Sequence, residues 1–128
     1  MRPEIKSELL AALRSGVYKK TNYLLCKDID LKCMCTEGVL CDLYAKHHPN
    51  ESSWEVTDNG SSVNIHFQKN TCTMPAKVTS WAAANFPYQT PIGTSVDFFV
   101  GENKVPLTDT NDECETFEQV AQQIEKYL

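Results

Sequence analysis

Hydrophobic residues in this chain of 128 residues follow two different spacings, one typical of helices and one typical of strands, and together they indicate a fold that contains both. Leu9 and Leu13 lie four residues apart near the N-terminus, within an apolar stripe typical of a helix that buries one face. Val63, Ile65 and Phe67 alternate with polar residues, which is the spacing of a strand that buries one face. Because both spacings occur, the sequence predicts an α+β fold.

Prolines and capping residues mark the ends of four expected helices. Pro3 suits the first position of a helix, and Gly16 suits the left-handed residue that follows a last turn. Thr36 is expected to cap the second helix, and Pro75 to open the third. Thr116 begins a capping box at the start of the fourth. The expected helices cover residues 3–15, 36–48, 75–85 and 116–128.

Polar turns separate three pairs of short apolar segments, which are expected to form β-hairpins. The expected pairs are residues 23–26 with 31–35, 53–56 with 63–68, and 96–100 with 105–107. The economical arrangement is a single compact α+β domain over residues 1–128. In it, about four helices pack on a mostly antiparallel sheet built from hairpins.

The inward faces of these elements predict one hydrophobic core. Trp81 is the largest residue expected there, and its replacement by alanine is expected to cost roughly 3–5 kcal/mol. The residues expected to be buried together are Leu9, Leu13, Leu40, Leu43, Ile65, Phe67, Trp81, Phe117, Val120 and Ile124.

Six cysteines could form three disulfides in a secreted chain, but the N-terminus lacks the apolar segment of a signal peptide. We therefore expect reduced thiols and a location in the cytoplasm of a bacterial host. No apolar run approaches the roughly 18 residues that a membrane span needs, so we expect no membrane association. The cysteines are Cys26, Cys33, Cys35, Cys41, Cys72 and Cys114.

Cysteines and histidines lie close together in the sequence around the second expected helix, which suggests zinc or thiol chemistry. Cys33, Cys35, Cys41, His47 and His48 are the residues concerned. Their spacing matches no recurrent structural zinc pattern. Cys41 and His47 are six residues apart, whereas residues that face each other on a helix are three or four apart. We therefore expect no metal, no cofactor and no catalytic residue.

Positive charge gathers near the N-terminus, although the whole chain carries a net charge of −5. Residues 1–32 contain seven Lys or Arg and four Asp or Glu, whereas the chain from Asp97 onward contains eight acids and two lysines. The acidic total argues against nucleic-acid binding. The densest basic stretch could hold a small phosphate-like anion, or could be an ordinary solvated surface. It consists of Arg14, Tyr18, Lys19 and Lys20.

Three blocks of sequence stand out: LLAALRSGVYKK at residues 9–20, CTEGVLCDLY at 35–44 and NDECETFEQVAQQIE at 111–125. In order and spacing they resemble a family of small bacteriophage proteins that read roughly LRSGKYKQ, CCLGVLCDLY and LND…SFEEIADLIE. A Pro-x-x-Val-x-x-Trp segment is similar as well, here at residues 75–81. Thr36 and Glu37 depart from the family, which has an apolar or small pair before the glycine; Glu37 brings a charge to this position. It is either a charge that suits a helix N-terminus or part of a retuned ligand pocket.

The resemblance implies a phage origin rather than a particular chemistry. Small accessory proteins of phages often act on the host, including against its immune systems. We expect a non-catalytic protein that binds and sequesters a nucleotide-derived immune signal, and that forms a homo-oligomer. Direct inhibition of a host defence protein, and a small hydrolase or thiol enzyme acting on such a signal, are the alternatives. The expected ligand-binding residues are Arg14, Tyr18, Lys19, Lys20 and Glu37.

Overall fold

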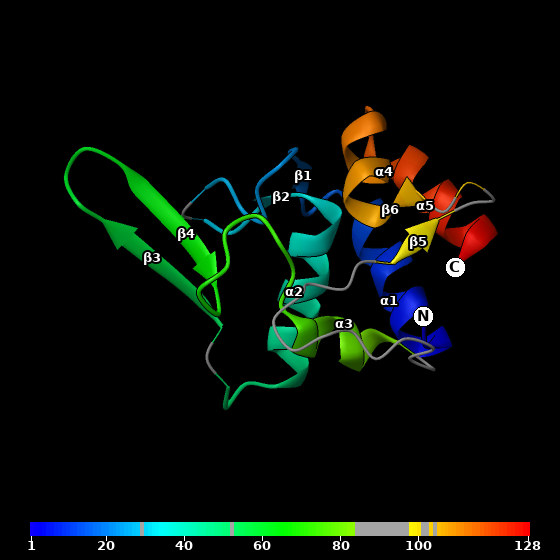
Figure 1. Ribbon diagram of the computed structural model, residues 1–128, viewed down its shortest axis with the longest axis horizontal. Coiled ribbons are helices and arrows are strands. Elements are labelled where there is room, and N and C mark those ends of the chain that lie inside the picture. Colours follow the sequence, from blue (N-terminus) through cyan, green and yellow to red (C-terminus); the bar gives the residue numbers. More distant parts are fainter. Residues whose placement is uncertain (29, 52, 84–97, 101–102, 104) are drawn as a thin grey trace.

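Helices and short strands alternate along the chain in the computed structural model, which describes residues 1–28, 30–51, 53–83, 98–100, 103 and 105–128 (Figure 1). The helices are α1 (Pro3–Arg14), α2 (Thr36–His47), α3 (Ala76–Ala82), α4 (Leu107–Glu113) and α5 (Phe117–Tyr127). The strands are β1 (Lys19–Lys20), β2 (Cys33–Met34), β3 (Trp54–Asp58), β4 (Val63–Phe67), β5 (Phe99–Val100) and β6 (Val105–Pro106). The α+β class is therefore confirmed.

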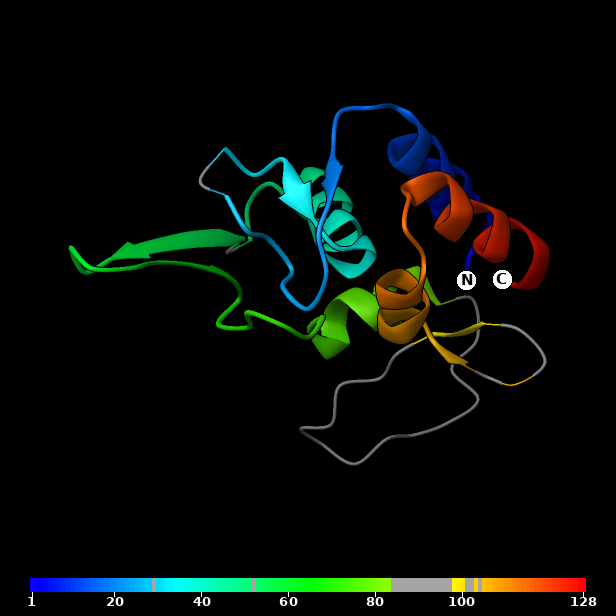
Figure 2. The same ribbon diagram turned by 90° about the horizontal axis from the view of Figure 1, so that it is seen from above.

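The helices α1 and α5 form where their end signals predict them. Pro3 occupies the first turn of α1, and Gly16 follows its end with φ of +77°. Thr116 and Gln119 form the capping box of α5. The two helices lie side by side (Figure 2), because each carries an apolar stripe that the other covers. The buried residues of the two stripes are Ile5, Leu9, Leu13, Phe117, Val120, Ala121 and Ile124.

Helix α2 lies at the centre of the core and begins one residue differently from the expectation. Cys35, not Thr36, is the capping residue, and its Sγ accepts a hydrogen bond from the N–H of Gly38 at 3.4 Å. Cys35 has the extended backbone of a capping residue, whereas Thr36 is already the first residue of the helix, and its hydroxyl donates to Oδ1 of Asn111 at 2.8 Å. Every residue from Thr36 to Cys41 is buried, so the start of α2 is enclosed by the rest of the molecule.

The strands form three separate two-stranded sheets among the described residues, so the expected single, mostly antiparallel sheet is wrong. β1 pairs with β2 in parallel, Lys19 opposite Cys33, where a hairpin of residues 23–26 and 31–35 was expected. Tyr23 and Leu31 have φ of 69° and 56°, and these left-handed residues break both expected arms. Only an isolated bridge from Cys26 to Met34 remains of that hairpin in the described chain.

The second expected hairpin is confirmed as the antiparallel pair β3–β4, which projects from the body of the molecule (Figures 1 and 2). Its apolar face is covered only near the base. Ile65 and Phe67 are buried, whereas Val56 and Val63 are 49% and 48% exposed. The expectation that Val63 faces the core is therefore wrong, because the body does not reach the outer half of the hairpin.

Helix α4 was not predicted, and it begins where a strand was expected to end. Its sequence, LTDTNDE, has no apolar stripe, and its buried residues are Leu107, Thr110 and Asn111. The third expected hairpin is confirmed in part, since β5 and β6 pair antiparallel. The expected end of the third helix near residue 85 and the start of a strand at residue 96 lie outside the described residues.

The expected core is confirmed except at one position. The other nine residues named above are buried, but Trp81 is only half-buried. Its ring lies across the end of α2, with its centroid 5.4 Å from that of Tyr44 and 5.9 Å from that of His48. The guanidinium carbon of Arg2 lies 5.9 Å from the same ring. Trp81 therefore closes the edge of the core rather than filling its centre.

Candidate functional site

Tyr18 and Asp42 join the first two distinctive sequence blocks. Tyr18 is buried, and its hydroxyl donates a hydrogen bond to Oδ2 of Asp42. Nε1 of Trp54 donates to the other carboxylate oxygen at 3.1 Å, and Nζ of Lys46 lies 3.3 Å from Oδ2. Burial, followed by the bond to Asp42, raises the pKa of Tyr18. This cluster balances its own charges and ties the chain after α1 to α2 and β3.

Arg14 is paired with two carboxylates of the third block. Its Nε lies 2.9 Å from Oε2 of Glu118, and its Nη1 lies 2.7 Å from Oε2 of Glu125. The bond from Arg14 holds the pKa of Glu118 below its ordinary value. The guanidinium charge is therefore balanced within the fold, where it links α1 to α5.

Asn111 joins the second and third blocks inside the core. Its Oδ1 accepts from the N–H of Thr36 at 3.0 Å and from the hydroxyl of Thr36. Its Nδ2 donates to the carbonyl of Thr21 at 3.1 Å. The buried amide is thus hydrogen-bonded at both ends, and it fixes the start of α2 against α4.

Glu37 is 3% exposed in the first turn of α2. One carboxylate oxygen accepts from the N–H of Met74 at 3.2 Å, and the other accepts from the hydroxyl of Thr108. Arg14, Tyr18 and Glu37, three of the expected ligand-binding residues, therefore take part in three different contact networks. The structure does not bring these three side chains into one site.

The two expected lysines differ in their surroundings. Lys19 is exposed on β1. Lys20 is half-buried, its Nζ donates to Oδ1 of Asn22 at 2.6 Å, and burial lowers its pKa. Lys20 is the one expected residue in a cleft of about 570 Å³ beside the end of α4. This acidic cleft is lined by Lys20, Thr21, Asn22, Tyr23, Asp112, Glu113, Cys114 and Glu115.

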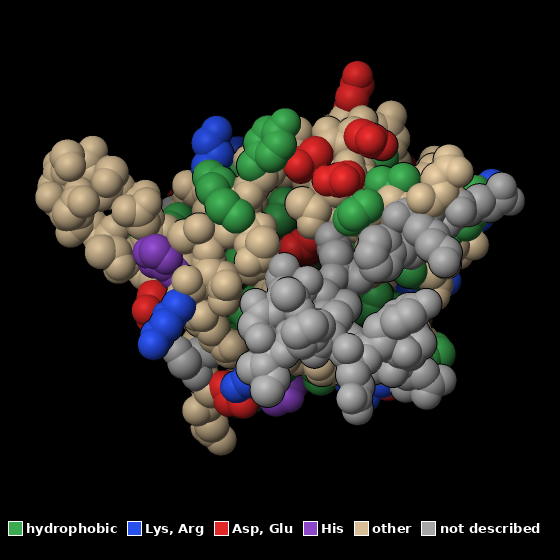
Figure 3. Space-filling view, in the orientation of Figure 1, with side chains coloured by type: hydrophobic (Ala, Val, Ile, Leu, Met, Phe, Trp, Pro, Cys, Tyr) green, Lys and Arg blue, Asp and Glu red, His purple; other side chains and the backbone are tan. Residues whose placement is uncertain are grey.

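Tyr23 lines this acidic cleft and is 72% exposed. Its φ of 69° is rare for a residue with a side chain. The N–H of Tyr23 donates to Oδ1 of Asp112 at 3.3 Å, which contributes to holding the loop against α4. The neighbouring Leu24 is also exposed. In the space-filling view, acidic side chains gather over α4 and hydrophobic ones lie beside them (Figure 3).

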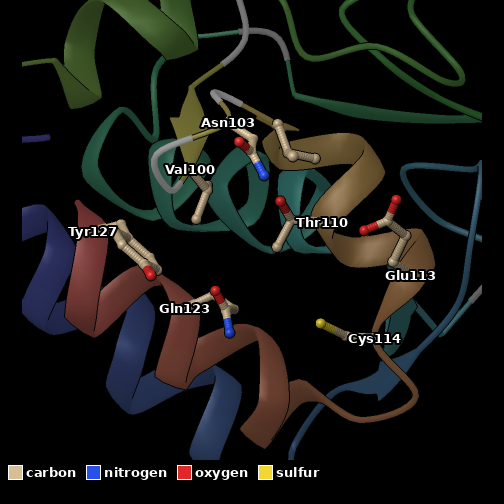
Figure 4. Close-up of a pocket in the computed structure, with 8 residues that line it drawn as sticks. Val100, Asn103, Thr110, Glu113, Cys114, Gln123 and Tyr127 are labelled. Atoms are coloured by element: carbon tan, nitrogen blue, oxygen red, sulfur yellow. The ribbon is translucent and has the colours of Figure 1, made fainter.

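A second hollow of about 450 Å³ lies between α4, α5 and the β5–β6 pair (Figure 4). We call it the α4–α5 cavity. Tyr127 stands at one end and Glu113 at the other, while Gln123 and Cys114 point into the space between them. Glu113 and Cys114 border both hollows. The lining of the α4–α5 cavity is Val100, Asn103, Val105, Thr110, Glu113, Cys114, Gln123 and Tyr127.

The cysteines and histidines in and beside α2 are either buried or in contact with other side chains of the fold. Burial raises the pKa of Cys35 to about 12 and the pKa of Cys41 well above its ordinary value, so both thiols stay protonated near neutral pH. His47 contacts Glu8 at 2.8 Å, and His48 stacks on Tyr44 with ring centroids 4.0 Å apart. The six thiols are free.

Neither a metal site nor a membrane helix is found in the described part of the chain. No three Cys, His, Asp or Glu side chains of those residues are grouped so that they could hold a metal ion. No described helix is both long and apolar enough to cross a membrane.

Apart from Lys20, the sequence did not predict that the residues bordering the two hollows form part of a site. One signal was visible, namely the excess of acids toward the C-terminus. The left-handed backbone of Tyr23 has no such signal, because tyrosine is not a residue that favours this conformation.

A family model described as a domain of unknown function (DUF8296) matches residues 1–128. No curated protein and no solved structure matches the chain.

Proposed function

We propose that this chain, which belongs to the DUF8296 family, is a non-catalytic binding protein that docks on a basic surface of a protein partner. The observation that carries the proposal is the exposed ring of Tyr23 at the acidic cleft. A left-handed residue with a side chain costs free energy, and such residues gather at functional sites. The loop nevertheless displays the aromatic side chain to solvent instead of burying it.

The charges of the acidic cleft suit a cationic partner group. Asp112, Glu113 and Glu115 bring three carboxylates to the lining, against the single cation of Lys20. A lysine or arginine side chain would be attracted by the carboxylates and by the face of the Tyr23 ring. Leu24 adds apolar surface beside them. Tyrosine is also among the residues that most often dominate protein–protein binding energy.

The proposed setting is the one that the resemblance implies: a phage protein that acts in the host cytoplasm against a defence protein. Sequestration of a nucleotide-derived signal remains the second candidate, because Lys19 is exposed and Lys20 lies beside it. Two of the residues expected to bind such a signal already have partners within the fold, which makes sequestration the weaker candidate. A phosphate would have to displace two carboxylates from Arg14, and the carboxylate of Glu37 already accepts two hydrogen bonds. If the protein sequesters such a signal, we expect it to do so as a homo-oligomer.

The test is affinity purification of the tagged protein from phage-infected cells, with circular dichroism to verify folding. Tyr23→Ala removes the exposed ring, and the double variant Glu113→Gln/Glu115→Gln removes two carboxylates from the acidic cleft. The matched control, Glu55→Gln/Asp58→Asn, removes two carboxylates from the projecting hairpin. We expect a protein partner that wild type and control retain equally, and that both cleft variants lose by about tenfold or more.

Two results would count against the proposal. A partner retained equally by all four proteins would place the binding surface elsewhere. A small anion that is released intact by heat denaturation, and that is lost from a Lys19→Ala/Lys20→Ala variant, would support sequestration instead.

A further inference from the structure

The α4–α5 cavity joins an aromatic ring, amide groups and a carboxylate, and its described lining contains no Lys or Arg. Its volume of about 450 Å³ falls within the range of roughly 300–1,000 Å³ that is typical of small-molecule sites. With Glu113 as the charged residue of this lining, an uncharged ligand fits better than an anion.

Gln123 differs from the other two glutamines of α5. Gln119 completes the capping box, and Gln122 donates to Oε1 of Glu118 at 3.4 Å. The side chain of Gln123 has no hydrogen-bond partner among the described residues, and it points into the α4–α5 cavity (Figure 4). Its amide therefore offers a ligand both a donor and an acceptor.

Tyr127 gives the same cavity an open aromatic surface. Tyr127 is 39% exposed and lines the cavity, so part of its ring is open to a ligand, and Nζ of Lys126 lies 4.9 Å from the ring centroid. Heterocyclic bases stack on such rings whatever their sequence context. At the opposite end, the carboxylate of Glu113 can only accept hydrogen bonds when it is ionised, so it selects a ligand with N–H donors.

We infer that the α4–α5 cavity binds a neutral purine nucleoside, whose base stacks on Tyr127 and bonds to the amide of Gln123 and the carboxylate of Glu113. Guanine presents two adjacent donor groups, which suit a carboxylate, so guanosine binds more tightly than adenosine. A 5′-phosphate weakens binding, because Glu113 lines the cavity and because Asp112 and Glu115 outnumber the cation of Lys20 in the adjoining acidic cleft. This inference stands apart from the proposed protein partner.

The test is calorimetric titration of the full chain with guanosine, adenosine and guanosine 5′-monophosphate. Guanosine is expected to bind saturably and to be the tightest of the three. Gln123→Ala should weaken it by about fivefold, the loss of one hydrogen bond. Tyr127→Ala should weaken it by about tenfold or more, whereas Tyr127→Phe keeps the ring and stays close to wild type. Gln122→Ala is the matched control and should bind like wild type.

Several outcomes would overturn the inference: no saturable binding of either nucleoside, equal losses in Gln122→Ala and Gln123→Ala, or tighter binding of the monophosphate than of guanosine. Tyr23→Ala lies in the acidic cleft and should leave guanosine binding unchanged. This variant separates the two proposals: it should lose the protein partner but keep guanosine binding.

Discussion

Gly38 shows at the scale of one residue why the second sequence block reads as it does. A Cβ atom at this position would lie 1.8 Å from the carbonyl oxygen of Leu25 and 3.1 Å from Cβ of Met34. The start of α2 therefore passes directly against the backbone of the preceding loop. Alanine is ordinarily favoured over glycine in a helix by about 1 kcal/mol, so the glycine is explained by this approach and not by helix propensity.

We therefore predict that Gly38→Ala destabilises the protein by about 3 kcal/mol or more, since the contact is with backbone that cannot rotate away. Gly60→Ala is the control, because nothing lies within 4 Å of its added Cβ and its φ of +86° alone is unfavourable. That variant should lose about 1 kcal/mol. Urea unfolding followed by circular dichroism measures both. Equal losses would mean that α2 can move away from the loop.

At the scale of one element, the β3–β4 hairpin has an inner half that belongs to the core and an outer half that does not. Ile65 is 5% exposed, whereas Val63 on the same face is 48% exposed. The outer half is held by the β3–β4 ladder and by a turn in which Oδ1 of Asn59 accepts from the N–H of Ser62 at 3.0 Å. Its apolar residues therefore contribute little burial.

Ile65→Ala is accordingly predicted to reduce the free energy of unfolding by about 3 kcal/mol, because it leaves a cavity beneath the hairpin. Val63→Ala removes side-chain atoms from the same strand and should change it by about 0.5 kcal/mol or less. The two unfolding midpoints in urea give the comparison. If Val63→Ala were as costly as Ile65→Ala, the outer half of the hairpin would be covered in solution.

At the scale of the whole molecule, carboxylates hold separate parts of the fold together. Glu118 accepts from Arg14 and links the two terminal helices. Glu51 accepts from the hydroxyl of Tyr44, and its Oε1 lies 3.5 Å from Nζ of Lys77. These bonds lower the pKa values of Glu118 and Glu51 below their ordinary value of 4.5. Both groups thus bind protons more weakly in the folded state than in the unfolded state.

The sign of the resulting pH dependence follows from these lowered pKa values. The stabilisation is fully present above the unfolded pKa of about 4.5 and is lost as the pH falls through the folded values. We predict that the urea midpoint drops between pH 7 and about pH 3, and that Arg14→Ala makes this drop smaller. Lys27→Ala, which removes one exposed cation, should show the same drop in urea midpoint as wild type. If the urea midpoint of Arg14→Ala dropped as much as that of wild type, the ion pairs of Arg14 with Glu118 and Glu125 would not contribute to stability in acid.

Local patterns in the sequence were sufficient to predict α1, α5 and β4. The stripe of α1, the capping box at Thr116 and the alternation through Ile65 and Phe67 each depend on residues two to four positions apart. Burial of one face then follows directly, and the class of the fold with it. The sequence pattern placed the cap of α2 one residue too late, because Cys35 has the extended backbone of a capping residue and Thr36 is already helical.

Three features could not be predicted from local patterns: the parallel pairing of β1 with β2, the existence of α4, and the two hollows beside α4. Each of these depends on contacts between residues that are distant in sequence, as in the bond between Thr36 and Asn111, 75 positions apart. Arg14 shows the consequence for a site. Its position beside two lysines suggested an anion ligand, but the packing of α1 on α5 brings it to Glu118 and Glu125. Local spacing contains no information about which helices will pack together, and that packing chooses the partners of every charge.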